Sequence, residues 1–226
     1  MMKLKDFFKA VVVVFLTLQS TILYSQESKG LGIGLGTDMV SRYLWRGLNI
    51  GGDCAHFQPY ASLNYKFLEV GAWASYGLSN NNEAETNYYE YDLYAKCTIN
   101  NFGLGFTNYN IRDYGNSSEI TLSYKGGEKF PLHASFNKYV IHDDASYIDL
   151  GYIFCNKSLI PLDFNVGMTP SAGSYGDKGG VVNISLTATY ETMESDKFSI
   201  PIHTSVMVNP QIDKTFFMVG ITLSTK

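Results

Sequence analysis

Residues 38–47 read Asp38-Met39-Val40-Ser41-Arg42-Tyr43-Leu44-Trp45-Arg46-Gly47, and they end a run in which every second residue is apolar. The apolar positions start at Leu31, and the residues between them are first glycines and then mostly charged side chains. A period of two predicts a β-strand with one apolar and one polar face. We therefore expect one long strand over residues 30–46, with its charges opposite its aromatic side chains.

The first 25 residues have the features of a secretory signal peptide. Lys3, Lys5 and Lys9 form a positive amino-terminal region, and residues 10–18 form a short apolar core. The core is short for a transmembrane helix, and no other apolar run in the chain approaches its length. We predict that residues 1–25 direct export and that residues 26–226 form one domain. An uncleaved helical anchor is the alternative.

The composition excludes some classes of protein. Residues 1–25 hold three lysines and one aspartate, so the remaining chain carries 14 basic and 20 acidic side chains. This excess of acid argues against a nucleic-acid partner, which calls for a basic face. The mean hydropathy of −0.07 is far below that of a helical membrane protein. Aromatic residues make up 15% of the chain, as expected for a barrel with aromatic girdles at two membrane interfaces.

Period-two alternation recurs along the chain, and the segments are separated by residues that favour turns. Their connections are short at one predicted end and mostly longer and more polar at the other, which is typical of outer-membrane barrels. We predict an all-β fold, an antiparallel up-and-down transmembrane β-barrel of about twelve strands. Ten or fourteen strands, or a secreted β-sandwich, remain alternatives. The predicted strands cover residues 30–46, 55–66, 68–78, 87–99, 102–111, 118–125, 131–142, 146–155, 161–169, 180–191, 198–208 and 214–225.

Three stretches in the first third of the chain match a known pattern. They are Ser41-Arg42-Tyr43-Leu44-Trp45-Arg46-Gly47, then Gln58-Pro59, then Val70-Gly71-Ala72-Trp73-Ala74-Ser75. In this order they resemble the TorF-type (Gcw_chp) family of Gram-negative outer-membrane porins, with a specific match over about residues 36–77. Ser25-Gln26 is similar to the signal ends of Bacteroidetes exports. The resemblance implies an outer-membrane barrel, but the family supplies no substrate.

Charged side chains fall on the predicted lumen face of nearly every strand. Asp38, Arg42 and Arg46 share one face at spacings of four residues, about 13 Å per step. Two interpretations remain open: a charged ladder that selects solutes, or structural pairing with carboxylates that closes the lumen, since buried charges must be paired or solvated. The candidate lumen-lining residues are Asp38, Arg42, Arg46, Gln58, Glu90, Asp92, Lys96, Glu119, Asp149, Asp163 and His203.

Other motifs point to chemistry only weakly. His203-Thr204-Ser205 resembles the His-x-Ser of outer-membrane phospholipases and lipid A deacylases, but Val206 follows where those enzymes usually have Asn. Gly30, Gly32, Gly34 and Gly36 lie within a strand, where they leave room in the lumen or let the strand coil. We expect no catalytic residue, cofactor or metal site, and no disulfide among the three cysteines, whose spacing matches no zinc motif.

These observations predict passive diffusion of a small hydrophilic solute through a water-filled, charged lumen. The expected partners are outer-membrane lipid and the barrel-assembly machinery, and the oligomeric state and the solute stay open. The alternative is a closed structural barrel that binds a partner through its external loops, above all residues 79–86 and 170–180.

Overall fold

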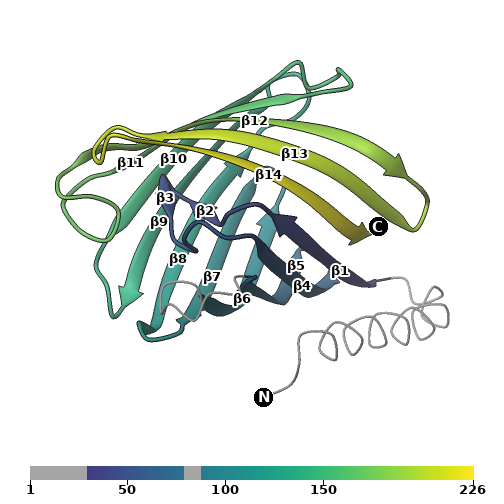
Figure 1. Cartoon of the computed structure of the whole chain (residues 1–226). Helices are drawn as coiled ribbons and strands as arrows, with labels where there is room; N and C mark the ends of the chain where they lie inside the picture. Colours follow the sequence, from purple (N-terminus) through teal and green to yellow (C-terminus); the bar gives the residue numbers. More distant parts are fainter. Residues whose placement is uncertain (1–29, 79–87) are drawn as a thin grey trace.

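The computed structural model of the chain describes residues 30–78 and 88–226 (Figure 1). The predicted signal peptide and the loop 79–86 lie outside these residues. Twelve strands form a closed barrel, and two short strands form a separate hairpin. The elements are β1 (Leu31–Val40), β2 (Leu44–Trp45), β3 (Leu48–Asn49), β4 (His56–Tyr65), β5 (Leu68–Gly77), β6 (Tyr89–Ile99), β7 (Phe102–Ile111), β8 (Gly115–Lys125), β9 (Leu132–Ile141), β10 (Ser146–Phe154), β11 (Leu162–Thr169), β12 (Gly180–Glu194), β13 (Phe198–Asn209) and β14 (Lys214–Thr225).

Each barrel strand pairs antiparallel with the next barrel strand along the chain, and β14 closes the ring against β1. The prediction of an up-and-down barrel of twelve strands is confirmed. Closure leaves no strand edge unpaired, which a wall surrounded by lipid requires because lipid offers backbone groups no hydrogen bonds. Within residues 30–78 and 88–226, no helix is long and apolar enough to cross a membrane.

Alternation along the strands gives the barrel an apolar outer surface. Leu93, for example, is 54% exposed, and it pairs with Ala72 of the neighbouring strand β5. So many exposed large apolar side chains are unusual for a surface in contact with water. They suit contact with lipid tails. Further exposed apolar residues of the wall include Leu63, Val70, Leu104, Leu122, Leu150, Leu186 and Phe217.

The two rims of the barrel differ in their connections. At one rim, named here the short-turn rim, β4 and β5 are joined by residues 66–67, and β6 and β7 by residues 100–101. The opposite rim, the long-loop rim, carries the segments 41–55 and 170–179, and β5 ends and β6 begins at this rim. The predicted alternation of connection length holds for these two segments. It does not hold for residues 112–114, 142–145 and 210–213 at the long-loop rim, which are shorter than residues 126–131 and 155–161 at the short-turn rim.

The prediction of one strand over residues 30–46 is wrong at its carboxyl end. Strand β1 ends at Val40, and residues 41–55 leave the barrel wall and fold inward. Tyr43 and Trp45, which the alternation places on the lipid face, instead contact the aromatic rings of Trp73 and Tyr175. Within the inward segment the chain reverses in a tight turn at Arg46 and Gly47, whose φ angles are 50° and 88°. Two consecutive positive φ angles are the mark of a type I′ turn, which reverses a chain in two residues.

Candidate functional site

The inward segment is held in the lumen by its own small hairpin, named here the inner hairpin, which consists of β2, β3 and the turn between them. Leu44 pairs with Asn49, and Trp45 pairs with Leu48. Figure 1 shows β2 and β3 within the ring of barrel strands. A hairpin in this position narrows any path through the barrel.

The inner hairpin reaches opposite walls of the barrel. On one side, the Asn209 side chain of β13 donates a hydrogen bond of 3.1 Å to the carbonyl oxygen of Gly47. On the other side, the rings of Trp45 and Tyr109 of β7 lie 6.0 Å apart. Strands β13 and β7 are six positions apart in a ring of twelve, so they face each other. The hairpin therefore spans the lumen.

The turn residue Gly47 fits closely against the wall. A methyl group added at this position would collide with the carbonyl oxygen of Val182 in β12. Its φ of 88° also lies in the region that favours glycine. Only a residue without a side chain allows this approach of two backbones.

Arg46 forms the main polar contact between the inner hairpin and the wall. Its two terminal nitrogens donate to the two carboxylate oxygens of Glu119 in β8, at 2.6 and 2.8 Å. Its guanidinium carbon also lies 4.5 Å from the ring centre of Trp45 and 4.8 Å from that of Tyr147. Glu119 is only 1% exposed. A two-pronged, buried ion pair of this kind fixes position as well as charge.

A second loop closes over the ion pair. Tyr175 belongs to residues 170–179 at the long-loop rim, and its side chain is buried. Its hydroxyl accepts a hydrogen bond from Arg46 and donates one of 3.4 Å to Glu119. Its ring centre lies 5.5 Å from that of Trp45. Two loops that are distant in sequence thus meet at one buried charge pair.

The other end of the inward segment is held by aromatic and neutral contacts. The Tyr43 ring lies 5.4 Å from Trp73 of β5 and 5.8 Å from Tyr88. Next to it, His56 at the start of β4 donates through Nε2 to the carbonyl oxygen of Gly51 at 2.9 Å, and its Nδ1 is hydrogen-bonded to Ser75 at 2.8 Å. Among residues 30–78 and 88–226, this side of the barrel therefore holds the inward segment by ring contacts and neutral hydrogen bonds, with no ion pair between β4, β5 or β6 and the segment.

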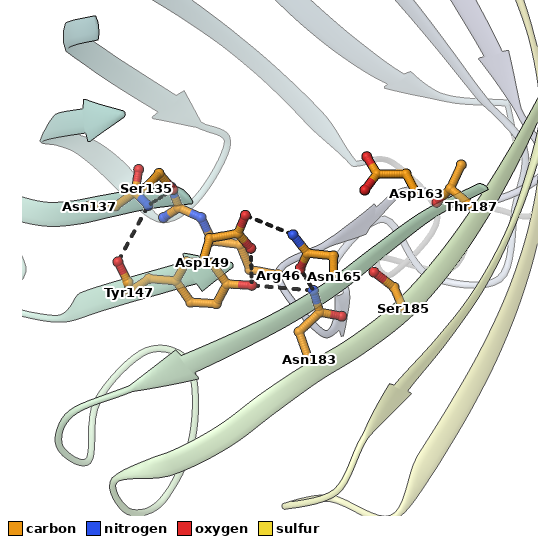
Figure 2. Close-up of a pocket in the computed structure, with 10 residues that line it drawn as sticks. All are labelled: Arg46, Ser135, Asn137, Tyr147, Asp149, Asp163, Asn165, Asn183, Ser185 and Thr187. Atoms are coloured by element: carbon orange, nitrogen blue, oxygen red, sulfur yellow. Dashed lines mark hydrogen bonds between the residues drawn. The ribbon is translucent and has the colours of Figure 1, made fainter. Parts of the chain in front are cut away.

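A polar cavity of about 350 Å³ lies beside the inner hairpin, along strands β9 to β12 (Figure 2). Arg46 stands at the hairpin end of the cavity, and Asp163, near the start of β11, lies toward the short-turn rim. A Cβ at Gly167 would collide with the Tyr147 hydroxyl, so this glycine makes room for the Tyr147 ring. The lining residues are Arg46, Ser135, Asn137, Tyr147, Asp149, Asp163, Asn165, Asn183, Ser185 and Thr187.

Four of the eleven candidate residues gather at the ion pair and the cavity. Arg46, Asp149 and Asp163 line the cavity, and Glu119 binds Arg46. His133, which the candidate set lacks, lies between the two aspartates, 2.8 Å from Asp163 and 3.9 Å from Asp149.

The other candidates lie elsewhere. Glu90 and Asp92 are buried together on β6. Gln58 donates a hydrogen bond to Ser75, and Asp38 accepts one from Thr222. Lys96 is exposed and pairs across the sheet with Glu69. His203 packs against Gly220.

Arg42 departs from the expected ladder with Asp38 and Arg46. Because β1 ends at Val40, the spacing of four no longer places Arg42 on a strand. It pairs instead with Asp53 of its own segment at 3.1 Å, and the Asp53 side chain is largely exposed. The ladder prediction is therefore wrong at this residue.

Tyr43, Tyr147 and Tyr175 lie in the lumen, whereas the aromatic content of the sequence predicts girdles at the membrane interfaces. Gly47 is a weak signal for the reversal of the chain at the inner hairpin, since glycine suits the second central position of a type I′ turn, but Arg46 is not one of the residues that usually precede it there. For the His203-x-Ser205 motif, the structure shows Ser205 accepting a hydrogen bond of 3.0 Å from Thr187. Within residues 30–78 and 88–226, no group of His, Cys, Asp or Glu has the arrangement of a metal site, and the three cysteines are free.

Comparisons with known proteins support the fold. The structure is similar to that of the KdgM porin, with a TM-score of 0.55 over 85% of this chain and 98% of that one, at 6% sequence identity. A KdgM porin in complex with disordered oligogalacturonate gives a TM-score of 0.52 over 86% and 98% of the two chains, also at 6% identity. An outer membrane channel from Pseudomonas putida F1 gives 0.49 over 87% and 95%, at 16% identity.

The two similarities to KdgM porin structures show a porin-like barrel fold. No protein-family model matches the chain, and no curated protein matches it. The resemblance to the TorF-type family therefore stays a prediction from sequence.

Proposed function

We propose that the protein is an outer-membrane channel through which small hydrophilic solutes diffuse. The observation that carries the proposal is the contrast between the two faces of the closed wall. The outer face is apolar, and the inner face is polar and encloses a cavity of about 350 Å³ next to the inner hairpin. The fold likeness to porins supports it. Outer-membrane lipid and the barrel-assembly machinery are the partners that this location requires.

In this proposal the inner hairpin sets the width of the path. Solutes pass between the hairpin and the parts of the wall that it leaves free. The charge of Arg46 is matched by Glu119, so the carboxylates of Asp149 and Asp163 dominate the field along the cavity wall. Fixed charges along the wall of a pore tune its ion preference.

The test is a single-channel recording from the protein purified in detergent and inserted into a planar bilayer. A gel-mobility shift on heating first confirms that the barrel is folded. Discrete and reproducible current steps are the expected result. A folded barrel that gives no current would contradict the proposed channel function.

One observation favours a second candidate, a closed barrel that acts through its external loops. Arg46, Glu119 and Tyr175 join two loops and the wall across the lumen, and this contact is buried. If that contact seals the barrel, the protein gives no current, whereas a variant without the inner hairpin conducts. Current from the natural protein decides for the channel.

A further inference from the structure

The cavity beside the inner hairpin contains a built network of hydrogen bonds. Asn165 donates to Asp149 at 2.7 Å, and Asn183 donates to Asn165 at 3.2 Å and to the Tyr147 hydroxyl at 3.3 Å (Figure 2). Ser185 and Thr187 follow on the same face of β12. Neutral amides and hydroxyls therefore form most of the wall, with one aromatic ring at its edge.

One acceptor in this network is left over. The Oδ1 atom of Asn183 has no hydrogen-bond partner among the described residues, although the side chain is only 5% exposed. A buried polar atom without a partner is costly, so it gains from a donor brought by a ligand. The carboxylates of Asp149 and Asp163 add further acceptors.

The charges of the cavity wall discriminate between ligands. Arg46, the one cation among the lining residues, already gives two hydrogen bonds to Glu119. Asp149 and Asp163 remain, and both contact His133. An anionic ligand would meet like charge here, whereas a neutral ligand rich in hydroxyl groups would supply the donors that the wall lacks.

We propose that this cavity is a binding subsite for an uncharged, hydroxyl-rich solute of one or two sugar rings. The volume of about 350 Å³ lies within the range of small-molecule pockets. The amide nitrogens of Asn165 and Asn183 already donate within the network, so what the two side chains leave for a ligand hydroxyl is the unpartnered Oδ1 of Asn183, a hydrogen-bond acceptor. This inference deepens the proposed channel function, on which it rests, by naming the class of solute.

Isothermal titration calorimetry on the protein purified in detergent tests the subsite without relying on current. Maltose is the neutral probe, and digalacturonate is the probe of the same ring number that carries negative charge. We expect maltose to bind and digalacturonate to bind at least about tenfold more weakly. Equal affinity for the two probes, or no heat with maltose, overturns the proposal.

Variants assign the binding to the cavity. Asn183→Leu removes the unpartnered acceptor, and we expect it to weaken maltose binding about tenfold, the size of one lost hydrogen bond. Asn64→Leu is the matched control, because Asn64 is a strand residue of β4 that bonds to Ser62 away from the cavity. If Asn183→Leu does not fold, Ser185→Ala is the milder test and must weaken binding. Unchanged maltose affinity in the folded cavity variant contradicts the subsite.

A double variant tests the role of the two carboxylates. Replacing both Asp149 and Asp163 with Asn should raise the affinity for digalacturonate and leave the affinity for maltose within about threefold of its original value.

The experiments distinguish failure of the subsite from failure of the channel. Current without maltose binding rejects the subsite and keeps the channel, whereas maltose binding by a folded barrel that gives no current rejects the channel and keeps the subsite.

Discussion

Two buried carboxylates in the lumen, Glu119 and Glu90, have opposite surroundings. Glu119 on β8 receives two hydrogen bonds from Arg46. Glu90 on β6 accepts a hydrogen bond of 2.5 Å from the Tyr88 hydroxyl, and Asp92 is buried two residues further along the same face. Among residues 30–78 and 88–226, neither Glu90 nor Asp92 forms an ion pair. One wall thus holds the inward segment by charge and the other by neutral contacts.

This difference shows that the inward segment can narrow the lumen while it is fixed to the wall at only two places, one charged and one neutral. Near Glu119, the position of the inner hairpin depends on one buried ion pair, and loss of either partner leaves a buried charge without its counter-charge. Near Glu90, the position of the inward segment depends on the Tyr43 ring and on the His56 hydrogen bonds, so several neutral groups contribute to it. The charged anchor is therefore the more fragile of the two.

The largest expected effect comes from Glu119→Gln. The change leaves the Arg46 guanidinium buried without its counter-charge, so we expect the free energy of unfolding to fall by about 3–5 kcal/mol. The freed positive charge should also shift the ion preference of the pore toward anions. Urea unfolding in lipid vesicles measures the first effect, and the reversal potential in a KCl gradient measures the second.

Glu90→Gln is the matched control for that change. The amide oxygen of Gln still accepts the hydrogen bond from Tyr88, and no described cation loses a partner. We expect a change in unfolding free energy within about 1 kcal/mol. If both variants lose the same stability, the contrast between the two walls is wrong.

A smaller effect is expected from Gly47→Ala. The added methyl group meets the Val182 carbonyl oxygen, and the φ of 88° strains any residue with a side chain. The free energy of unfolding should fall by about 1–3 kcal/mol, and the conductance should rise because the inner hairpin moves away from β12. Gly115→Ala separates the two causes, since Gly115 has a φ of 84° and nothing lies within 4 Å of its added Cβ. An equal rise in conductance for Gly115→Ala would contradict the role of the close approach.

The sequence predicted the barrel well because its signal is local and repeated. Strand β14 spans Lys214–Thr225, the same residues that the alternation of 214–225 predicts. Each such strand must place one face toward lipid and one toward the lumen, so a period of two is sufficient to find it.

The same signal fails at residues 41–46. Tyr43 and Trp45 continue the apolar alternation of β1, but the aromatic groups that receive them, such as Trp73 and Tyr175, are distant in sequence. Alternation reports only that one face is apolar, and an aromatic cluster in a lumen satisfies it as well as lipid does. The pairing of Arg46 with Glu119 likewise depends on tertiary placement, which a single sequence does not encode in any local pattern.

The smallest effect that tests the comparison is that of Tyr175→Phe. The change keeps the ring against Trp45 and removes only the hydroxyl that joins Arg46 and Glu119. Because the two-pronged ion pair remains, we expect a loss of about 1 kcal/mol in unfolding free energy and a small rise in conductance. Tyr114→Phe, at a residue that is 87% exposed, should change neither quantity. If Tyr175→Phe lowers the free energy of unfolding as much as Glu119→Gln does, the hydroxyl and not the ion pair is the main anchor. In that case the loop 170–179, and not the wall, fixes the inner hairpin at this side of the barrel.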